Sequence, residues 1–255
     1  MNISTINLSV YLKKKILNEI SLEIPAGKFV SIVGPNGSGK TTLLRAISGL
    51  IPFKGDILLN SKNVKGIIKN QDDKKIAYIP QNMIIPNGMT LAEYVMFGRI
   101  SHLGWLKVES HKDFEVVMEA LEKVNLLNYS KNLITTLSGG EMQRAIIART
   151  LAQEADILIL DEPTAFMDFA RSGEILKILN DFRLEKKLTI LMSSHDINNL
   201  IPFSDFIIAL KHGKKLYSGD IKGFLNEKFL SSLYDTNIKF FYDDKKNIKV
   251  FSDII

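Results

Sequence analysis

The chain has 255 residues, which fits one or two domains and allows a large core without covalent staples. The absence of cysteine excludes disulfide scaffolds, thiolate metal sites and cysteine nucleophiles. No apolar run reaches the length of a membrane span, no signal-peptide pattern opens the chain, and the net charge of +5 comes from scattered lysines, so we expect neither a bilayer crossing nor a nucleic-acid partner.

Strand and helix signals alternate along the chain, which predicts an α/β protein with a mostly parallel sheet. Alternating apolar residues before Pro25 predict an antiparallel β piece, and the apolar run 29–33 predicts the first core strand. Further strands are expected at 56–59, 76–79, 157–160, 188–192 and 206–210, and helices from Lys40 onward and over 90–99, 112–127 and 141–153.

The chain is predicted to form a single domain over 1–255 with an insertion. Between residues 85 and 155 helical spacing occurs without a core strand, which predicts a helical subdomain. Residues 1–84 and 156–235 are then expected to form the sheet-based core. Residues 236–255 are expected to form a hairpin tail with strands at 237–242 and 247–251.

Residues 34–42 read GPNGSGKTT and match the phosphate-loop pattern GxxxxGK[ST], directly after a predicted strand and before a predicted helix. In such a loop backbone N–H groups turn toward one anion, the lysine adds positive charge, and the hydroxyl that follows binds Mg²⁺. A glycine-rich turn without function is the alternative, which the flanking elements disfavour. The expected nucleotide contacts are Gly34, Pro35, Asn36, Gly37, Ser38, Gly39, Lys40, Thr41 and Thr42.

Two acidic residues, Asp161 and Glu162, follow the predicted strand 157–160, and Pro163 ends that strand. Ligands of open α/β sheets bind at this carboxyl edge. Because successive side chains of a strand diverge, Asp161 can hold Mg²⁺ while Glu162 faces an attacking water. An acidic pair at a strand end is often only a helix cap, but together with a phosphate loop it favours phosphoryl transfer.

The segment LSGGEMQ, residues 137–143, predicts a helix that begins at Ser138 with Glu141 as its capping-box partner. Gly139 and Gly140 leave the N–H groups of the first turn uncovered. Such a helix start can bind a second anion. Without further context it would be only a well-capped helix.

These segments together resemble the nucleotide-binding subunit of an ATP-binding-cassette (ABC) transporter, from Tyr11 to about Asp220. The resemblance is carried by GPNGSGKTT, Gln81, LSGGEMQ, ILILDEP and the histidine after the strand 188–192. It implies an ATPase with ATP and Mg²⁺ as cofactors, a homodimer of cassettes, two transmembrane permease subunits and, indirectly, a substrate-binding protein. It also implies a peripheral location on the cytoplasmic face of the inner membrane.

The resemblance implies roles for individual residues. It makes Tyr11 the residue that stacks on adenine and Glu162 the general base. We further expect the apolar residues between Met83 and Phe97, which lie beside Gln81 in the sequence, to form the dock for the permease. Asp168 is a helix cap by default and a contact across the dimer by resemblance. The implied sets are Lys40, Gln81, Glu162 and His195 for catalysis, Thr41, Gln81 and Asp161 for Mg²⁺, and Ser138, Gly139, Gly140 and Asp168 for ATP held by the partner.

Two segments, GRISHLG at 98–104 and ARTLAQ at 148–153, resemble importers of iron siderophores, haem and cobalamin. Residues 165–168 depart from the usual family pattern, and the residues after Asp168 lack the usual His-Gln pair, which leaves the substrate open. Alternatives are a cassette for metal import or lipid export and a soluble ABC ATPase of cofactor assembly. The short stretch between Lys40 and Ser138 disfavours DNA-repair members, and the presence of Lys40, Asp161 and Glu162 disfavours an inactive cassette.

Overall fold

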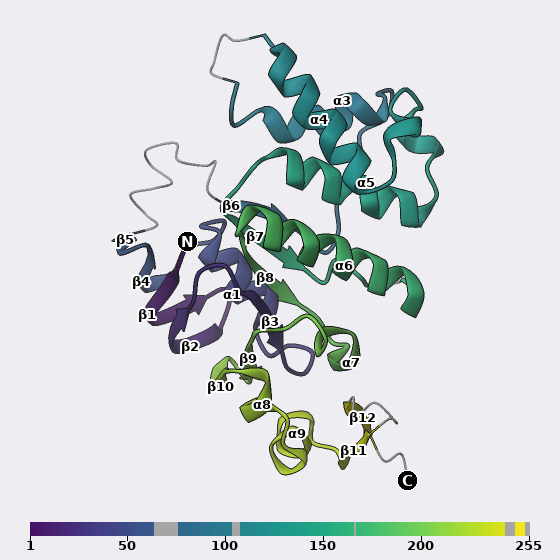
Figure 1. Cartoon of the computed structure of the whole chain (residues 1–255). Helices are drawn as coiled ribbons and strands as arrows, with labels where there is room; N and C mark the ends of the chain where they lie inside the picture. The colour runs from purple at the N-terminus through teal and green to yellow at the C-terminus, as the bar shows by residue number, and fades with distance from the viewer. Residues whose placement is uncertain (64–75, 104–107, 166, 243–247, 253–255) are drawn as a thin grey trace.

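The computed structural model describes residues 1–63, 76–103, 108–165, 167–242 and 248–252. A layer of sheets lies at the centre of the molecule, a helical lobe lies at one end, and a small C-terminal unit lies at the other (Figure 1). The central sheet is mostly parallel, so the predicted α/β class is confirmed. None of the described helices combines the length and apolar character needed to cross a bilayer.

The strands form three sheets. The central six-stranded sheet has the order β10-β9-β3-β8-β7-β6, in which β10 is the antiparallel edge. A second sheet, β2-β1-β4-β5, is antiparallel, and β11 pairs with β12. The strands are β1 (Ile3–Tyr11), β2 (Lys15–Ile24), β3 (Phe29–Val33), β4 (Lys54–Leu59), β5 (Lys62–Asn63), β6 (Ile76–Ile79), β7 (Ile157–Asp161), β8 (Thr189–Ser193), β9 (Phe206–Lys211), β10 (Lys214–Gly219), β11 (Ile238–Tyr242) and β12 (Ile248–Ser252).

The helices largely follow the sequence expectations. The predicted helix 112–127 is shorter than expected, because α4 ends at Lys123 and Asn125 adopts a left-handed φ of 56°. The helices are α1 (Lys40–Ile47), α3 (Leu91–Met96), α4 (His111–Lys123), α5 (Gly139–Ala152), α6 (Phe169–Lys186), α7 (Ile197–Leu200), α8 (Ile221–Phe224) and α9 (Glu227–Tyr234), with the 3₁₀ turns η2 (Phe97–Arg99), η3 (Leu127–Tyr129) and η4 (Ile134–Thr136).

The central strands β3, β7 and β8 are buried over their whole length, which explains their uninterrupted apolar sequences. Phe29 and Val33 of β3 belong to a core shared with the helical lobe, while Val30 and Ile32 belong to a core shared with α1 and the antiparallel sheet. The helical lobe at 85–155 therefore has no separate core among the described residues. Its buried side chains join those of the sheet in one hydrophobic cluster.

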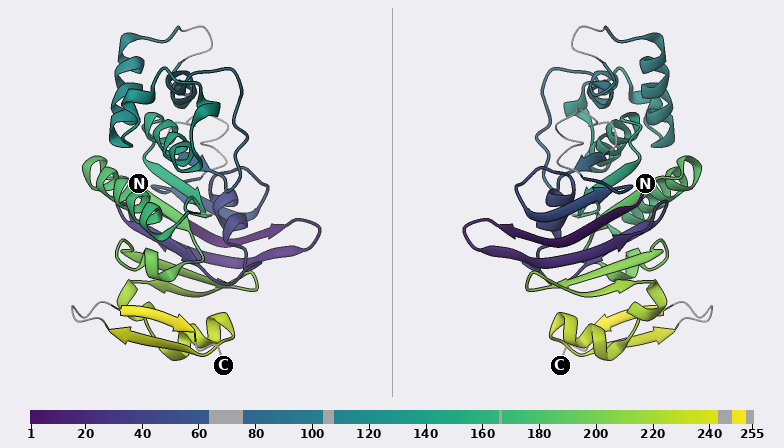
Figure 2. Two further views of the ribbon diagram at one scale, coloured as in Figure 1. Left: turned by 90° about the vertical axis from the view of Figure 1, so that its right-hand side faces the viewer. Right: turned by 90° about the vertical axis from the view of Figure 1, so that its left-hand side faces the viewer.

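The C-terminal hairpin lies at the end of the molecule away from the helical lobe (Figure 2). Its strands fall within one residue of the predicted 237–242 and 247–251, and its predicted turn lies outside the described residues. The inner face of the hairpin packs through Ile238 and Val250. The side-chain amide of Asn198 in α7 also pairs with the backbone of Val250, donating to its carbonyl at 2.9 Å and accepting from its N–H at 2.8 Å.

The sheet order gathers functional segments at one edge. In the parallel sheet β3 leads into residues 34–42, β7 ends at Asp161, and β8 ends at Ser193, which pairs with Asp161 in register. Carboxyl ends of parallel strands share one edge of a sheet, which is where ligands of α/β folds bind.

Candidate functional site

The phosphate loop connects β3 to α1, as predicted. Three of its glycines have positive φ: 141° at Gly34, 75° at Gly37 and 106° at Gly39. A Cβ atom at Gly34 would lie 2.0 Å from the carbonyl oxygen of Leu210, so only glycine allows the loop to pass β9 at this point. Gly39 caps α1 without a side chain, which leaves the first N–H groups of that helix open to an anion.

Lys40 is buried within this loop. Its ammonium group donates to the carbonyls of Gly34 at 2.8 Å and of Pro35 at 3.3 Å, so the side chain folds back over the loop. Burial lowers the pKa of Lys40, while the negative charges of Glu162 and Asp161 act in the opposite direction. The loop thus holds a desolvated cation beside the amides that would bind phosphate.

Asp161 is almost fully buried at the end of β7. Its Oδ1 atom accepts a hydrogen bond from the Thr41 hydroxyl at 3.0 Å and another from the Ser193 hydroxyl at 2.7 Å. Burial, followed by the charge of Asp161, raises the pKa of Tyr78 to about 12. A carboxylate and a hydroxyl are the hard oxygen ligands that Mg²⁺ prefers, so the donor set fits the predicted metal site.

Glu162 meets two of the other predicted catalytic residues. Its Oε2 atom accepts a hydrogen bond from Nε2 of Gln81 at 3.1 Å and lies 3.5 Å from Nδ1 of His195. Its backbone has a left-handed φ of 49°, a conformation that costs a non-glycine residue about 1 to 3 kcal/mol. Asp161 and Glu162 therefore diverge as predicted, one toward Thr41 and the other toward Gln81 and His195.

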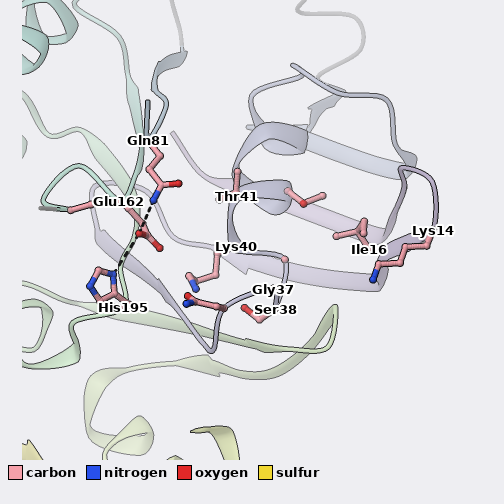
Figure 3. A pocket seen from close by; sticks show the side chains of 13 residues that line it. Lys14, Ile16, Gly37, Ser38, Lys40, Thr41, Gln81, Glu162 and His195 are labelled. Carbon is pink, nitrogen blue, oxygen red and sulfur yellow. Dashed lines mark hydrogen bonds and ion pairs between the residues drawn. The ribbon is translucent and has the colours of Figure 1, made fainter. Parts of the chain in front are cut away.

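Gln81, Glu162, His195 and residues 36–42 of the phosphate loop line a cavity of about 800 Å³, whereas Asp161, Gly34 and Pro35 are not among its lining residues (Figure 3). Gln81, Glu162 and His195 lie on one side, the phosphate loop lies in the middle, and Lys14 and Ile16 lie on the other side. Tyr11 is not among the lining residues. Its half-exposed ring instead faces the ammonium groups of Lys54 and Lys15, at 5.1 Å and 5.7 Å from the ring centroid. Stacking of Tyr11 on adenine stays a prediction.

The predicted capping box at the start of α5 is present. The Glu141 carboxylate accepts from the N–H of Ser138 at 2.8 Å and from its hydroxyl at 2.7 Å, and the Ser138 hydroxyl accepts from the N–H of Glu141. These bonds from the Ser138 side chain and backbone lower the pKa of Glu141. Ser138, Gly139 and Gly140 do not line the cavity, so the chain does not bring its two predicted anion sites together.

Asp168 caps α6, accepting from the N–H of Arg171 at 2.9 Å. Arg171 was not predicted as a site residue. Its guanidinium lies 3.2 Å from the position that a Cβ atom of Gly140 would take, which brings a positive charge to the start of α5. The only signal for Arg171 in the sequence was its place in the stretch after Asp168 that departs from the usual family pattern.

The cavity-lining residues Lys14, Ile16 and Ala165 were not predicted as site residues. Ser193 and Tyr78, which lie near Asp161, were also missed. Both lie on strands whose C-terminal ends come beside Asp161 only through the sheet order β8-β7-β6. The single signal for Ser193 was its position directly after the predicted strand 188–192.

The sequence profile described as ABC transporter matches residues 17–165, which is more than half of the chain. The chain belongs to the ABC transporter family. Among curated family members, the petrobactin import ATP-binding protein FpuD of Bacillus anthracis is 36% identical over 86% of this chain and 81% of its own length. The iron(3+)-hydroxamate import ATP-binding protein FhuC of Bacillus subtilis is 33% identical over 96% of this chain and 92% of its own length. The manganese transport system ATP-binding protein MntB of the same species is 36% identical over 91% and 92%.

Solved structures of ABC proteins have the same fold. A chain of an inward-facing ABC transporter superposes with a TM-score of 0.85 over 98% of this chain and 96% of its own length, and its 24% identity makes this a likeness of fold. The dimeric structure of the ABC transporter cassette MJ0796 superposes with a TM-score of 0.76 at 27% identity over 86% and 98%. The predicted membership in the ABC family is confirmed, and with it the class of ATP-binding and ATP-hydrolysing subunits.

Proposed function

We propose that the chain is the ATP-hydrolysing subunit of an importer for an iron chelate, located peripherally at the cytoplasmic face of the inner membrane. The observation that carries the ATPase part is the cavity where the phosphate loop meets Gln81, Glu162 and His195, with Asp161 hydrogen-bonded to Thr41 of the loop. The import part is supported by relatives whose names assign them to petrobactin and iron(3+)-hydroxamate import.

In this proposal the phosphate loop and Lys40 hold the β- and γ-phosphates of ATP. Thr41, Asp161 and Gln81 would hold Mg²⁺, which would offset the negative charge of the phosphates. Glu162 accepts a proton from the water that attacks the γ-phosphorus, while the bond to the β-phosphate oxygen breaks. His195 donates a hydrogen bond to the γ-phosphate, and its contact with Glu162 keeps the base and this donor together.

A second copy of the chain would complete the site. Ser138, Gly139, Gly140 and Asp168 are proposed to bind the γ-phosphate of ATP held by that copy, with Arg171 adding positive charge. Support comes from the open N–H groups at the start of α5, from the absence of this segment from the chain's own cavity, and from a dimeric cassette among the structural relatives.

A groove on the helical lobe is the proposed dock for a permease subunit. Its volume is about 660 Å³, and it overlaps the predicted segment between Met83 and Phe97. Phe97, Ile100 and Phe114 are exposed along it, and two carboxylates add negative charge. An amphipathic segment with apolar and basic residues would match this lining, which is Gly88, Met89, Ala92, Glu93, Met96, Phe97, Ile100, Leu103, Glu109 and Phe114.

The base assignment is tested by Glu162→Gln, which keeps the volume and the contact with Gln81. Hydrolysis should fall roughly 100- to 10,000-fold while ATP binding remains and an ATP-bound dimer accumulates. Glu119→Gln, on the exposed face of α4, is the matched control and should hydrolyse ATP normally. Undiminished steady-state hydrolysis by Glu162→Gln would reject Glu162 as the base.

The dimer is tested by Ser138→Arg, whose bulk should block the second anion site and abolish ATP-dependent dimerisation in light scattering. Glu122→Arg on α4 adds the same side chain at an exposed position and should dimerise normally. A normal ATP-induced dimer of Ser138→Arg would contradict the proposed second anion site.

The permease dock is tested by co-purification with the membrane partner, which Phe97→Asp should abolish and Phe251→Asp on the C-terminal hairpin should not. Crosslinks that map the permease to another surface of the chain would contradict the proposed dock.

The substrate class is tested on the complex with its permease and binding protein. Ferric siderophores are expected to stimulate its ATPase activity, with haem and cobalamin as the neighbouring classes. The alternatives are import of a free metal ion, which the manganese relative supports, and a cassette for lipid export or cofactor assembly. Stimulation by Mn²⁺ but not by iron chelates would replace the first proposal with the metal alternative.

A further inference from the structure

Ser193 carries a fully buried hydroxyl that bridges the carboxylate of Asp161 and the backbone N–H of Glu162. It is the last residue of β8 and pairs with Asp161 of β7 in the parallel register. Its Oγ atom donates to Oδ1 of Asp161 at 2.7 Å and accepts from the N–H of Glu162 at 3.0 Å. One side chain therefore contacts the carboxylate of the proposed metal site and the backbone of the proposed base.

The direction of both hydrogen bonds is fixed by chemistry. A backbone N–H can only donate, so the Ser193 oxygen accepts from Glu162. An ionised carboxylate can only accept, so the Ser193 proton points to Asp161. If the hydroxyl rotated away, the N–H of Glu162 would lose this acceptor and Asp161 would keep the bond from Thr41, so the rotation costs free energy.

The backbone of Glu162 needs such support. Its φ of 49° is unfavourable for a glutamate, and neighbouring contacts have to stabilise it. The bond from its N–H to Ser193 is one of them, and the bond from the N–H of Ala165 to its carbonyl at 3.0 Å is another. With the backbone fixed in this way, the side chain of Glu162 points toward Gln81 and His195, whereas the side chain of Asp161 points toward Thr41.

We propose that Ser193 is a positioning residue for ATP hydrolysis, which holds Asp161 and Glu162 in a fixed relation to each other. The inference rests on the proposed ATPase function, and it adds a residue that contacts neither ATP nor the attacking water. Ser193 acts through the carboxylate of Asp161 and the backbone of Glu162, so its loss should lower turnover more than nucleotide binding.

The first experiment compares Ser193→Ala and Ser193→Cys with wild type in steady-state ATPase assays. Alanine removes both hydrogen bonds, and cysteine nearly keeps the volume but replaces the hydroxyl by a weak donor. Both should lower kcat roughly 10- to 100-fold while KM for ATP stays within about threefold. Ser31→Ala is the matched control, since Ser31 is a buried serine of the neighbouring strand whose hydroxyl pairs with the hydroxyl of Ser204 at 2.5 Å, away from Asp161 and Glu162.

Ser31→Ala should keep kcat within about twofold of wild type even if it lowers the melting temperature as much as Ser193→Ala does. A kcat of Ser193→Ala within threefold of wild type would overturn the inference. Equal losses of kcat in the two serine variants would also overturn it, because they would indicate a general loss of stability. A rise in KM without a change in kcat would equally reject a role in positioning the base.

The second experiment does not depend on hydrolysis. The melting temperature is followed with a non-hydrolysable ATP analogue as Mg²⁺ is added. Because Ser193 orients Asp161, Ser193→Ala should need roughly 3- to 10-fold more Mg²⁺ for half of the stabilisation, while the effect of the analogue in EDTA is unchanged. An unchanged Mg²⁺ midpoint would overturn the inference. Absent hydrolysis by wild type would instead reject the proposed function and leave this readout intact.

Discussion

A buried arginine, Arg99, joins three segments of the helical lobe. Its Nε atom donates to Asp113 at 2.9 Å, and its Nη1 atom donates to Glu154 at 2.7 Å and to the carbonyl of Ala152 at 2.7 Å. Asp113 lies at the start of α4, Ala152 is the last residue of α5 and Glu154 follows it, while Arg99 itself ends η2. We expect Arg99→Met, which keeps most of the aliphatic volume, to destabilise this lobe strongly.

The size of the effect follows from the exposure of the partners. The side chain of Arg99 is 4% exposed and that of Asp113 is 8% exposed, and breaking such a buried pair costs about 3 to 5 kcal/mol. Glu154 is 44% exposed, so its pair adds less than about 1 kcal/mol. Ser110 still donates to the other oxygen of Asp113 through its backbone and hydroxyl, so we expect the lower end, about 3 kcal/mol.

Urea unfolding without nucleotide measures this loss. Lys186→Met is the matched control, since its exposed pair with Glu119 at 3.8 Å should contribute less than about 0.5 kcal/mol. Adding Asp113→Asn to Arg99→Met removes the unpaired charge, so the double variant should lose about 1 to 2 kcal/mol less than the sum of the single losses. A loss below about 1 kcal/mol for Arg99→Met, or strict additivity, would refute the reasoning.

Three further predictions concern other parts of the chain. Gly34→Ala places a Cβ atom 2.0 Å from a backbone carbonyl of β9, so ATP affinity in a fluorescence titration should fall more than about tenfold, and near-normal affinity would contradict the loop geometry. Hydrogen bonds from Ser110, ahead of the Arg99 charge, lower the pKa of Asp113 to about 2. Because this folded pKa lies below the unfolded value of about 3.9, the ionised carboxylate stabilises the fold above pH ~4, and this stabilisation is lost toward pH 2. In Asp113→Asn, the free energy of unfolding measured in urea should therefore change less between pH ~4 and pH ~2 than in wild type. Asn198→Asp replaces an amide donor with a carboxylate opposite the Val250 carbonyl, so hydrogen exchange in β12 should accelerate, and unchanged protection would rule out the Asn198 anchor.

The parts of the site that depend on adjacent residues could be predicted from the sequence. The phosphate loop, the capping box at Ser138 and the acidic pair after β7 each need particular side chains at fixed spacing, because each is built from one turn or one strand end. The divergence of Asp161 and Glu162 also follows from the local geometry of a strand. These predictions needed no knowledge of which strands are neighbours.

The contribution of Ser193 could not be predicted in this way. The alternation of strands and helices gives a parallel sheet but does not fix the order β3-β8-β7. Only that order brings the end of β8 beside Asp161. The contact of Arg171 with Gly140 likewise depends on how α6 packs beside the start of α5, which side-chain periodicity does not specify.

The described residues of the segment GRISHLG, 98–103, pack against the end of α5. A Cβ atom at Gly98 would lie 2.2 Å from the carbonyl oxygen of Arg149, Arg99 pairs with Asp113, and the His102 ring lies 2.8 Å from the Gln153 carbonyl. The described residues of this motif therefore hold the turn after α3 against the end of α5. That turn also forms part of the groove proposed to dock the permease. In the proposed function, the motif therefore helps to shape the surface that would dock the permease.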